Sequence, residues 1–353
     1  MEKIIDPVDI DLLLGELTEE RRLCATNKAG NVLYVFDGRE APNLLREVGR
    51  LREISFRAEG GCSGKSCDLD EYDTMDKPYQ QMIVWDPDAK AILGGYRFIL
   101  GPDIKIGENG QPELATSHLF NFSQRFIRDY LPHTMELGRS FVTPDYQSSK
   151  AGAKALFALD NLWDGIAAIT MNHPGIFYLF GKMTIYNTLP AGARDLILRF
   201  LDKHFPDSDE LVRPISPVLP VNDPHLLDLI LKDVDFKEDY RNLKAAVRSF
   251  DTNIPPLVNS YMNTSPSMRV FGTAACYDLS DAMETAILVP FNEMYEDKRD
   301  RHIQAFFRDR LARVRARFPH LDLDNENKLV RRFNEIRDRT FRRFKEKREK
   351  KEK

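Results

Sequence analysis

The segment at residues 135–142, MELGRSFV, constrains the fold most, because it places a glutamate and an arginine inside an apolar stretch. Apolar residues on both sides and a β-branched end predict a buried strand. Glu136 and Arg139 are three residues apart, so a regular strand would point them to opposite faces. Buried charges need partners. We therefore expect partners from elsewhere or a β-bulge that re-aims one side chain, and structural ion pairs explain the pattern as well as a reactive site does.

The remaining pattern predicts a mixed α/β fold in a chain of 353 residues, 42% of them hydrophobic and 30% charged. We expect one large domain over residues 1–295, with a helical insertion at about 205–262, and a charged helical extension over 296–353. The predicted strands are 30–37, 81–86, 91–100, 135–142, 176–180, 268–272 and 284–291, and the predicted helices are 41–56, 117–130, 148–171, 190–204, 224–233 and 237–249.

The chain shows no targeting or membrane-spanning pattern. Its first residues, MEKIIDPVDIDLLLGELTEE, lack the basic start and apolar core of a signal peptide, and charge interrupts every apolar patch well short of a bilayer span. The four cysteines are too few and too scattered for a disulfide framework. The expected location is cytoplasmic, or peripheral on the inner face of a membrane.

An acidic run at residues 68–76, DLDEYDTMD, leads into a predicted core strand. It lacks the glycine and terminal glutamate of a calcium-binding EF-hand loop. A solvated face is the simplest interpretation, but Leu69, Tyr72 and Met75 recur at threefold spacing and give the run an apolar side. Carboxylates fixed at the start of a strand can hold a substrate ammonium or orient a base.

The loop at residues 60–66, GGCSGKS, imitates a phosphate-binding loop without meeting its spacing. A P-loop needs four residues between the first glycine and Gly-Lys-Ser, and here Glu59 stands at the required position, after a helix. A flexible loop fits better. Cys62 and Cys67 have no histidine or second cysteine pair nearby, so we predict no metal site.

Taken in order, four motifs resemble the GNAT-fold acyltransferases that take acyl chains from acyl carrier protein. These are the acyl-homoserine-lactone synthases and the hemolysin-like aminolipid N-acyltransferases, and the resemblance covers about residues 30–295. The motifs are Arg52 with Phe56, Glu71-x-Asp73-x-x-Asp76, Gly94-Gly95-Tyr96-Arg97, and Glu136-x-x-Arg139-Ser140; nearer matches to the aminolipid enzymes are LWDGI at 162–166, LFG at 179–181 and IPPL at 254–257.

The resemblance implies a GNAT-like mixed central sheet with flanking helices, and it implies a reaction. The α-amine of an amino acid attacks a (3-hydroxy)fatty acyl thioester on the 4′-phosphopantetheine of acyl carrier protein. This step begins aminolipid synthesis, with glycine or ornithine lipids as the products of the family. No tightly bound cofactor is implied. An acyl-homoserine-lactone-type synthase and a non-catalytic GNAT-fold scaffold on membranes are the alternatives.

The same resemblance assigns roles to residues. Glu136, through a water molecule, is the first candidate for the base that deprotonates the ammonium, and Asp73 is the second. Backbone N–H groups of the strand would polarise the thioester carbonyl. Arg97 and Arg139 would pair with the acids or with the substrate carboxylate. Further substrate contacts fall to Arg52, Asp70, Glu71 and Asp76, and acyl or pantetheine contacts to Ser140, Phe141, Val142, Gln147 and Lys150.

The chain departs from its coenzyme-A-dependent relatives at the pyrophosphate cradle. Gln147 is present, but Lys150 occupies the place of the first glycine, and only Gly152 remains. This departure weakens the case for coenzyme A as the acyl donor and favours a carrier protein. Lys150 would attract the acidic surface of a carrier protein, although simple solvation explains this lysine equally well. The tryptophan of the lactone synthases is absent after the Arg52–Phe56 pair, which counts against S-adenosylmethionine as the acceptor.

The C-terminal residues 328–353 hold 13 Lys and Arg against 5 Asp and Glu, although the whole chain carries −4. Leu329, Phe333, Ile336, Thr340 and Phe344 fall on one helical stripe among them. A basic helix with an apolar face can lie on an anionic membrane. Nucleic-acid binding and a frayed, exposed helix are the competing interpretations, and the apolar stripe favours the membrane.

Overall fold

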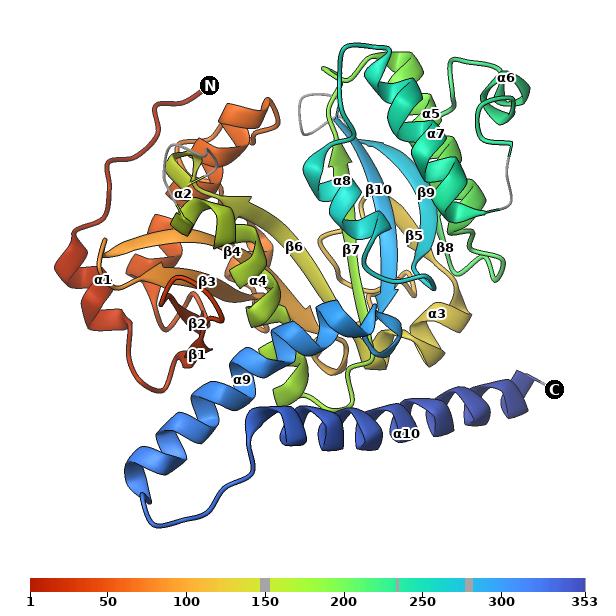
Figure 1. Ribbon diagram of the computed structural model, residues 1–353. Helices are drawn as coiled ribbons and strands as arrows, with labels where there is room; N and C mark the ends of the chain where they lie inside the picture. Colours follow the sequence, from red (N-terminus) through yellow and green to blue (C-terminus); the bar gives the residue numbers. More distant parts are fainter. Residues whose placement is uncertain (147–152, 233–234, 277–281, 353) are drawn as a thin grey trace. The chain divides into compact units, whose positions relative to one another are not determined.

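The computed structural model describes residues 1–146, 153–232, 235–276 and 282–352 (Figure 1). Contacts within the chain divide it into two compact units, and each is described by itself. Unit 1 comprises Met1–Ile104, Pro132–Phe177 and Glu296–Lys353, and unit 2 comprises Lys105–Leu131 and Tyr178–Tyr295. The division into residues 1–295 and 296–353 stays a prediction.

Unit 1 is built on five strands in the order β1-β2-β3-β4-β6, and each neighbouring pair is antiparallel. Four of these strands confirm the predicted ones. The short β1 was missed, because its sequence, RLCA, has neither the length nor the alternation of a half-buried strand. The bounds are β1 Arg22–Ala25, β2 Val32–Phe36, β3 Gln80–Asp86, β4 Ala91–Leu100 and β6 Thr134–Val142.

Helices α1 (Ile10–Glu16) and α2 (Pro42–Glu59) cover one face of this sheet. In α2 a proline lies in the first turn, where its missing N–H costs nothing, and Gly60 ends the helix at φ +87°. This helix confirms the one predicted over residues 41–56, and its large apolar side chains are buried or half-buried. It joins a core cluster of Leu13, Phe36, Ala41, Leu44, Leu45, Val48, Ile83, Trp85, Ile92 and Phe141.

The opposite face carries α4 (Ala153–Asn172), whose first residues the sequence had placed at 148–149, outside the described residues. Gly165 of this helix lies directly over Met82 and Leu33, so that a Cβ there would collide with the Met82 sulfur. Helix α9 (Glu296–Arg317) packs beside α4. Its His302 Nδ1 lies 2.7 Å from Asp164 Oδ1 on α4.

Helix α10 (Glu326–Glu352) follows α9 after an extended segment (Figure 1). It packs against the rest of unit 1, and Val330, Asn334, Arg337 and Phe341 are buried. The Arg337 guanidinium donates to the carbonyls of Thr170 and Ile176. This face repeats at helical spacing and sits one residue away from the stripe that the sequence assigned to a membrane.

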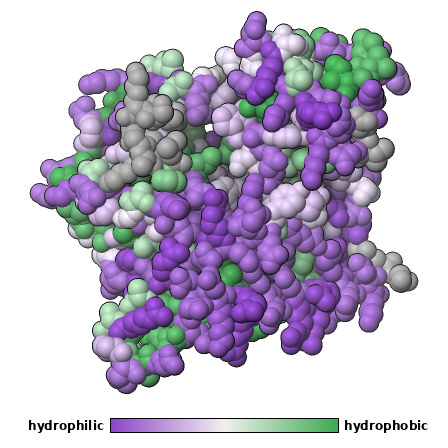
Figure 2. Space-filling view, in the orientation of Figure 1, coloured by the Kyte–Doolittle hydropathy of each residue, from purple (hydrophilic) through white to green (hydrophobic). Residues whose placement is uncertain are grey.

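The packing of α10 corrects the reason given for its membrane role. The Phe344 ring lies 5.2 Å from Phe177, and the Phe333 ring lies 5.8 Å from Phe307, so both aromatic residues of the predicted stripe contact protein. Ile336, 57% exposed, is the large apolar residue of that stripe left in solvent. What α10 presents outward is polar, and the surface over it is almost wholly hydrophilic in Figure 2.

Unit 2 contains an antiparallel sheet in the order β7-β10-β9 and a two-stranded ladder of β5 with β8. The helix predicted over 117–130 is partly wrong. Its first part is β5, which pairs with β8 and alternates as a strand does, because Phe120 and Phe122 are buried while Asn121 is exposed. Ser123, not Ser117, caps the helix that follows. The bounds are β5 Phe120–Phe122, α3 Gln124–Asp129, β7 Tyr178–Ile185, α5 Ala191–His204, β8 Val212–Pro214, α6 Pro224–Asp228, α7 Phe236–Arg248, α8 Pro256–Met262, β9 Arg269–Cys276 and β10 Ala282–Pro290.

Strands β9 and β10 and helices α5 and α7 confirm the predicted pattern, within a few residues at their ends, whereas α6 covers only the first half of the helix predicted over 224–233. The whole is a mixed α/β fold with flanking helices. Among the described helices, none combines the length and the apolar character that crossing a bilayer requires.

Candidate active site

A β-bulge in β6 is the first feature of the site, and it resolves the geometry of Glu136 and Arg139. Gly95 on β4 pairs with Phe141 and Arg97 pairs with Gly138, so β6 carries one extra residue between these pairs. Arg139 takes a left-handed conformation, with φ +49°. A residue with a side chain is strained in this conformation, and such strain persists only where the surrounding structure imposes it. The bulge re-aims Arg139, which is one of the two alternatives that the sequence left open.

Two glycines of β4 let the neighbouring strands approach closely beside this bulge. A Cβ on Gly94 would lie 2.5 Å from the Phe141 carbonyl oxygen, and a Cβ on Gly95 would lie 2.6 Å from the Met82 carbonyl oxygen. Real Cβ atoms do not approach backbone oxygens so closely. Gly94 is therefore needed for the close approach of β4 to β6 beside the bulge, and Gly95 for the close approach of β4 to β3 on its other side.

Asp73 is the hub of a buried ion cluster on the α2 face of the sheet. Its carboxylate accepts from Arg52 Nη1 at 3.2 Å, from Arg97 Nη1 at 3.2 Å and from Gln81 Nε2 at 3.0 Å, and the Asp70 N–H donates to it at 3.1 Å. The Asp73 side chain has no solvent exposure. Burial alone would raise its pKa, but the Arg52 and Arg97 guanidinium groups outweigh burial and hold the pKa well below its usual range.

The cluster continues through Asp70 toward the bulge. Asp70 accepts from Arg97 Nη1 at 2.6 Å and from Arg139 Nη2 at 3.3 Å. Arg139 Nε lies 3.1 Å from Asp68 Oδ2. Two arginines from neighbouring strands therefore share one carboxylate, and the acidic run is tied to the bulge by its own side chains.

Glu136 lies on β6, the strand that carries Arg139. It is 1% exposed and accepts a hydrogen bond from the Tyr79 hydroxyl. Tyr79 is fully buried, and the Arg97 guanidinium lies 5.1 Å from the centre of its ring. Its ring also makes an edge contact with Tyr72 at 5.7 Å. Glu136 is thus linked to the ion cluster through the aromatic ring of Tyr79.

The predicted residues Arg52, Asp70, Asp73, Arg97 and Arg139 meet in this cluster, with Glu136 beside it. Glu71 and Asp76 are exposed, so their predicted substrate contacts stay predictions. Gln147 and Lys150 lie outside the described residues. The Phe141 side chain belongs to the core cluster, which leaves the backbone of this residue as the part that could meet a substrate. Ser140 and Val142 are half-buried, and their acyl or pantetheine contacts stay predictions.

Sequence reasoning missed Asp68, Tyr79 and Gln81. Gln81 carried a usable signal, because it shares the inward parity of Ile83 and Trp85 on β3, and a buried amide at the start of a strand needs polar partners. Asp68 and Tyr79 lie in loop segments without such a pattern.

The cluster retains unused capacity toward a charged ligand. The buried Nε groups of Arg52 and Arg97 have no hydrogen-bond partner within the described part of the chain. A Cβ on Gly138 would lie only 3.7 Å from Arg97 Nε, so this donor sits beside the bulge. Three arginines face four carboxylates, including Glu136, which leaves one surplus negative charge to attract a cation such as an ammonium.

Comparison with known proteins identifies the domain. Residues 51–156 match the acetyltransferase (GNAT) domain family, a range that includes the second half of α2, the acidic run and the bulged strand. The chain also resembles a CoA-dependent acyl-homoserine lactone synthase, BjaI, solved with SAM and isopentyl-CoA. That likeness has a TM-score of 0.34 at 12% identity, over 79% of this chain and 90% of the other.

Two relatives are far more similar in sequence. The glycine N(alpha)-acyltransferase of Bacteroides thetaiotaomicron is 56% identical over 307 residues, covering 87% of this chain and 91% of the relative. The glycine N(alpha)-acyltransferase of Phocaeicola vulgatus is 53% identical over 306 residues, covering 87% and 94%. The chain therefore belongs to the family of these N-acyltransferases, and it is an acyltransferase built on a GNAT domain.

Proposed function

We propose that this enzyme moves a fatty acyl chain, including 3-hydroxy acyl chains, from acyl carrier protein to the α-amine of glycine. The observation that carries the proposal is the juxtaposition of an opened strand at Arg139 with a buried glutamate three residues earlier on the same strand. The curated names of the two relatives supply glycine as the acceptor. The product, an N-acyl glycine, is the lyso form of an aminolipid.

The chemical step needs a base, an electrophile and a leaving group. Glu136, through a bound water, takes a proton from the glycine ammonium, and the free amine attacks the thioester carbonyl carbon. The N–C bond forms, the C–S bond breaks, and the pantetheine sulfur leaves and takes up a proton. Asp73 is the weaker candidate for the base, because two guanidinium groups lower its pKa and with it its affinity for a proton.

The bulge supplies the electrophilic assistance. Arg139 and Ser140 have no partner on β4 in the strand register, so their N–H groups are candidates to donate to the thioester oxygen as negative charge develops on it. Fixed backbone donors of this kind need no reorganisation during the reaction. Removing one such donor in other enzymes costs about 10²–10³ in kcat.

The ion cluster suits the two ends of the acceptor. Its surplus negative charge attracts the ammonium, and the free Arg97 Nε beside Gly138 is a donor for the carboxylate.

The test is to incubate the purified chain with acyl carrier protein loaded with a 3-hydroxy fatty acid and with glycine, ornithine, lysine or serine. Mass spectrometry should find N-acyl glycine; an acylated ornithine or a lactone as the main product would overturn the assignment.

A carrier-protein donor, rather than coenzyme A, rests on the sequence at residues 147–152, which lie outside the described residues. The substitution of a lysine for the first glycine of the pyrophosphate cradle supports it. Rates should be compared for the same acyl chain on carrier protein and on coenzyme A. We expect kcat/KM to be higher with carrier protein, and an equal or higher value with coenzyme A would reject this donor.

Attachment to the inner face of a membrane, if the enzyme is cytoplasmic, would use the basic face of α10. The exposed cations include Arg331, Arg332, Arg339, Arg342 and Arg343, and each basic residue near an anionic surface contributes about 1 kcal/mol. Changing these five to glutamine leaves the buried face intact, which deletion of 328–353 would not. We expect the variant to lose co-sedimentation with phosphatidylserine vesicles; retained binding would reject this surface.

A further inference from the structure

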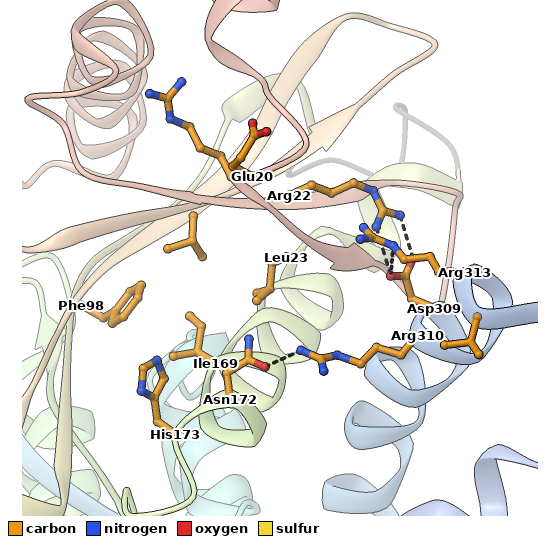
Figure 3. Close-up of a pocket in the computed structure, with 13 residues that line it drawn as sticks. Glu20, Arg22, Leu23, Phe98, Ile169, Asn172, His173, Asp309, Arg310 and Arg313 are labelled. Atoms are coloured by element: carbon orange, nitrogen blue, oxygen red, sulfur yellow. Dashed lines mark hydrogen bonds and ion pairs between the residues drawn. The ribbon is translucent and has the colours of Figure 1, made fainter. Parts of the chain in front are cut away.

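Unit 1 contains a second polar site, a pocket of about 480 Å³ on the sheet face opposite the ion cluster (Figure 3). Helix α9, the end of α4 and strands β1, β2 and β4 contribute its walls. Phe98, which lines it, follows Arg97 on β4 and therefore points to the other face of the sheet. The pocket is thus separate from the residues proposed to bind glycine and the thioester.

The walls of the pocket carry an excess of positive charge. Four arginines, Arg21, Arg22, Arg310 and Arg313, line it together with two acids, Glu20 and Asp309. Asp309 is already saturated, because it accepts two hydrogen bonds from Arg22 at 3.0 and 2.7 Å and lies 3.1 Å from Arg313 Nε. Arg313 also pairs with Glu19 just outside the lining, with its Nη1 lying 2.9 Å from Glu19 Oε1. With Glu19 counted, four arginines face three acids, and one positive charge remains in surplus.

Arg310 is the cation best placed to meet a ligand. Within the described part of the chain it forms no ion pair; it donates from Nη2 to Asn172 Oδ1 at 2.9 Å and lies over the Phe306 ring. A guanidinium has five N–H donors, so most of them are uncommitted. Figure 3 shows Arg310 reaching from α9 to Asn172, with Arg313 and Arg22 gathered around Asp309.

The floor of the pocket is apolar. Leu23 and Val35 are half-buried on the two outer strands, and Phe98 and Ile169 lie behind them with 3% exposure each. Pockets of a few hundred Å³ that combine an apolar lining with a few charged groups bind small organic molecules. The arrangement of arginines at the rim above aliphatic side chains fits a molecule with an anionic head and an aliphatic body.

We propose that this pocket is a binding site for an amphiphilic anion, a medium-length carboxylate whose head pairs with Arg310 and Arg313 and whose chain packs on Leu23, Val35 and Phe98. This site does not depend on the identity of the acceptor amino acid. If the proposed function is correct, the N-acyl glycine product belongs to the class of molecules that would bind here.

The first test is a titration of the full chain with decanoate, N-decanoyl glycine, decanol and inorganic phosphate by isothermal calorimetry. We expect the two carboxylates to bind and decanol and phosphate to bind at least ten-fold more weakly. The variant Arg310→Gln with Arg313→Gln should weaken carboxylate binding by about ten-fold or more, because two charge-assisted contacts are lost. Arg315→Gln with Arg317→Gln, exposed on the same helix but outside the pocket, is the matched control and should bind normally.

The second test locates the ligand. Crystals soaked with 10-bromodecanoate should show an anomalous bromine peak beside Leu23 and Phe98. Carboxylate binding that is the same in both double variants, or bromine density confined to the neighbourhood of the β6 bulge, would overturn the proposal. A phosphate affinity equal to that of decanoate would show that the site recognises only negative charge, and it would also reject an amphiphilic ligand.

Discussion

The replacement Asp73→Asn tests whether the ion cluster holds the acidic run to the sheet. The asparagine keeps the size of the side chain but removes the charge that faces Arg52 and Arg97, both of which are at most 3% exposed. It also turns an acceptor oxygen into an NH₂ group that faces N–H donors. Breaking a buried ion pair by removing one partner costs about 3–5 kcal/mol, a large part of the stability of a typical domain.

Urea unfolding at pH 7, followed by circular dichroism, measures this loss. Asp76→Asn is the matched control, because Asp76 belongs to the same acidic run but is exposed, and its curve should overlay the wild type. A loss below about 1 kcal/mol in Asp73→Asn would show that Asp73 does not hold these arginines and would refute the cluster as a structural unit.

The pH dependence of the same variant provides a second check with a defined sign. The pKa of Asp73 is lower in the folded chain than its ordinary value of 3.8, so its ionised form stabilises the fold above that pH. This contribution is lost as the pH falls below 3.8 toward the folded value. The difference in stability between the wild type and Asp73→Asn should therefore shrink at low pH; a difference that stays constant down to pH 2.5 would contradict the lowered pKa.

Three further changes probe the site and its supports. Tyr79→Phe removes the donor to Glu136 and should lower kcat/KM by about ten-fold, whereas Tyr72→Phe in the same loop should not; equal effects would reject a specific role for the Tyr79 hydroxyl. Gly94→Ala forces β4 away from the bulge and should cost about 1–3 kcal/mol and most of the activity, whereas Gly15→Ala, with nothing within 4 Å of its added Cβ, should be neutral or stabilising. Phe341→Ala should expose α10 to hydrogen exchange, measured by mass spectrometry; protection equal to the wild type would contradict the docking of that helix.

The sequence predicted the site better than it predicted the packing of the tail. Glu136 and Arg139 on one strand implied either partners from elsewhere or a bulge, because period-2 alternation cannot bring them together, and the structure has both. The link between Asp68 and Arg139 was not predictable, since it depends on how a loop without periodicity folds back on the sheet. The family resemblance identified the charged residues of the site by their motifs, but it did not indicate which of them are buried.

The tail shows the opposite case. Its apolar stripe was correctly recognised as a helical face, but the sequence cannot tell whether such a face meets lipid or the chain itself. In the structure the Phe344 ring contacts Phe177 and His133, because α10 packs over the end of α4 and the loop that follows it. The basic residues on the outward face are what remains for an external partner.

The activity of a Glu136 variant tests the central claim most directly. Glu136→Gln keeps the shape of the side chain and can still accept from Tyr79, so the fold should persist, as checked by circular dichroism. Transfer of a 3-hydroxy acyl chain from carrier protein to glycine should fall at least about 10²-fold in kcat at pH 7, the usual contribution of a positioned general base. Activity within a few-fold of the wild type in a folded Glu136→Gln enzyme would show that this carboxylate is not the base.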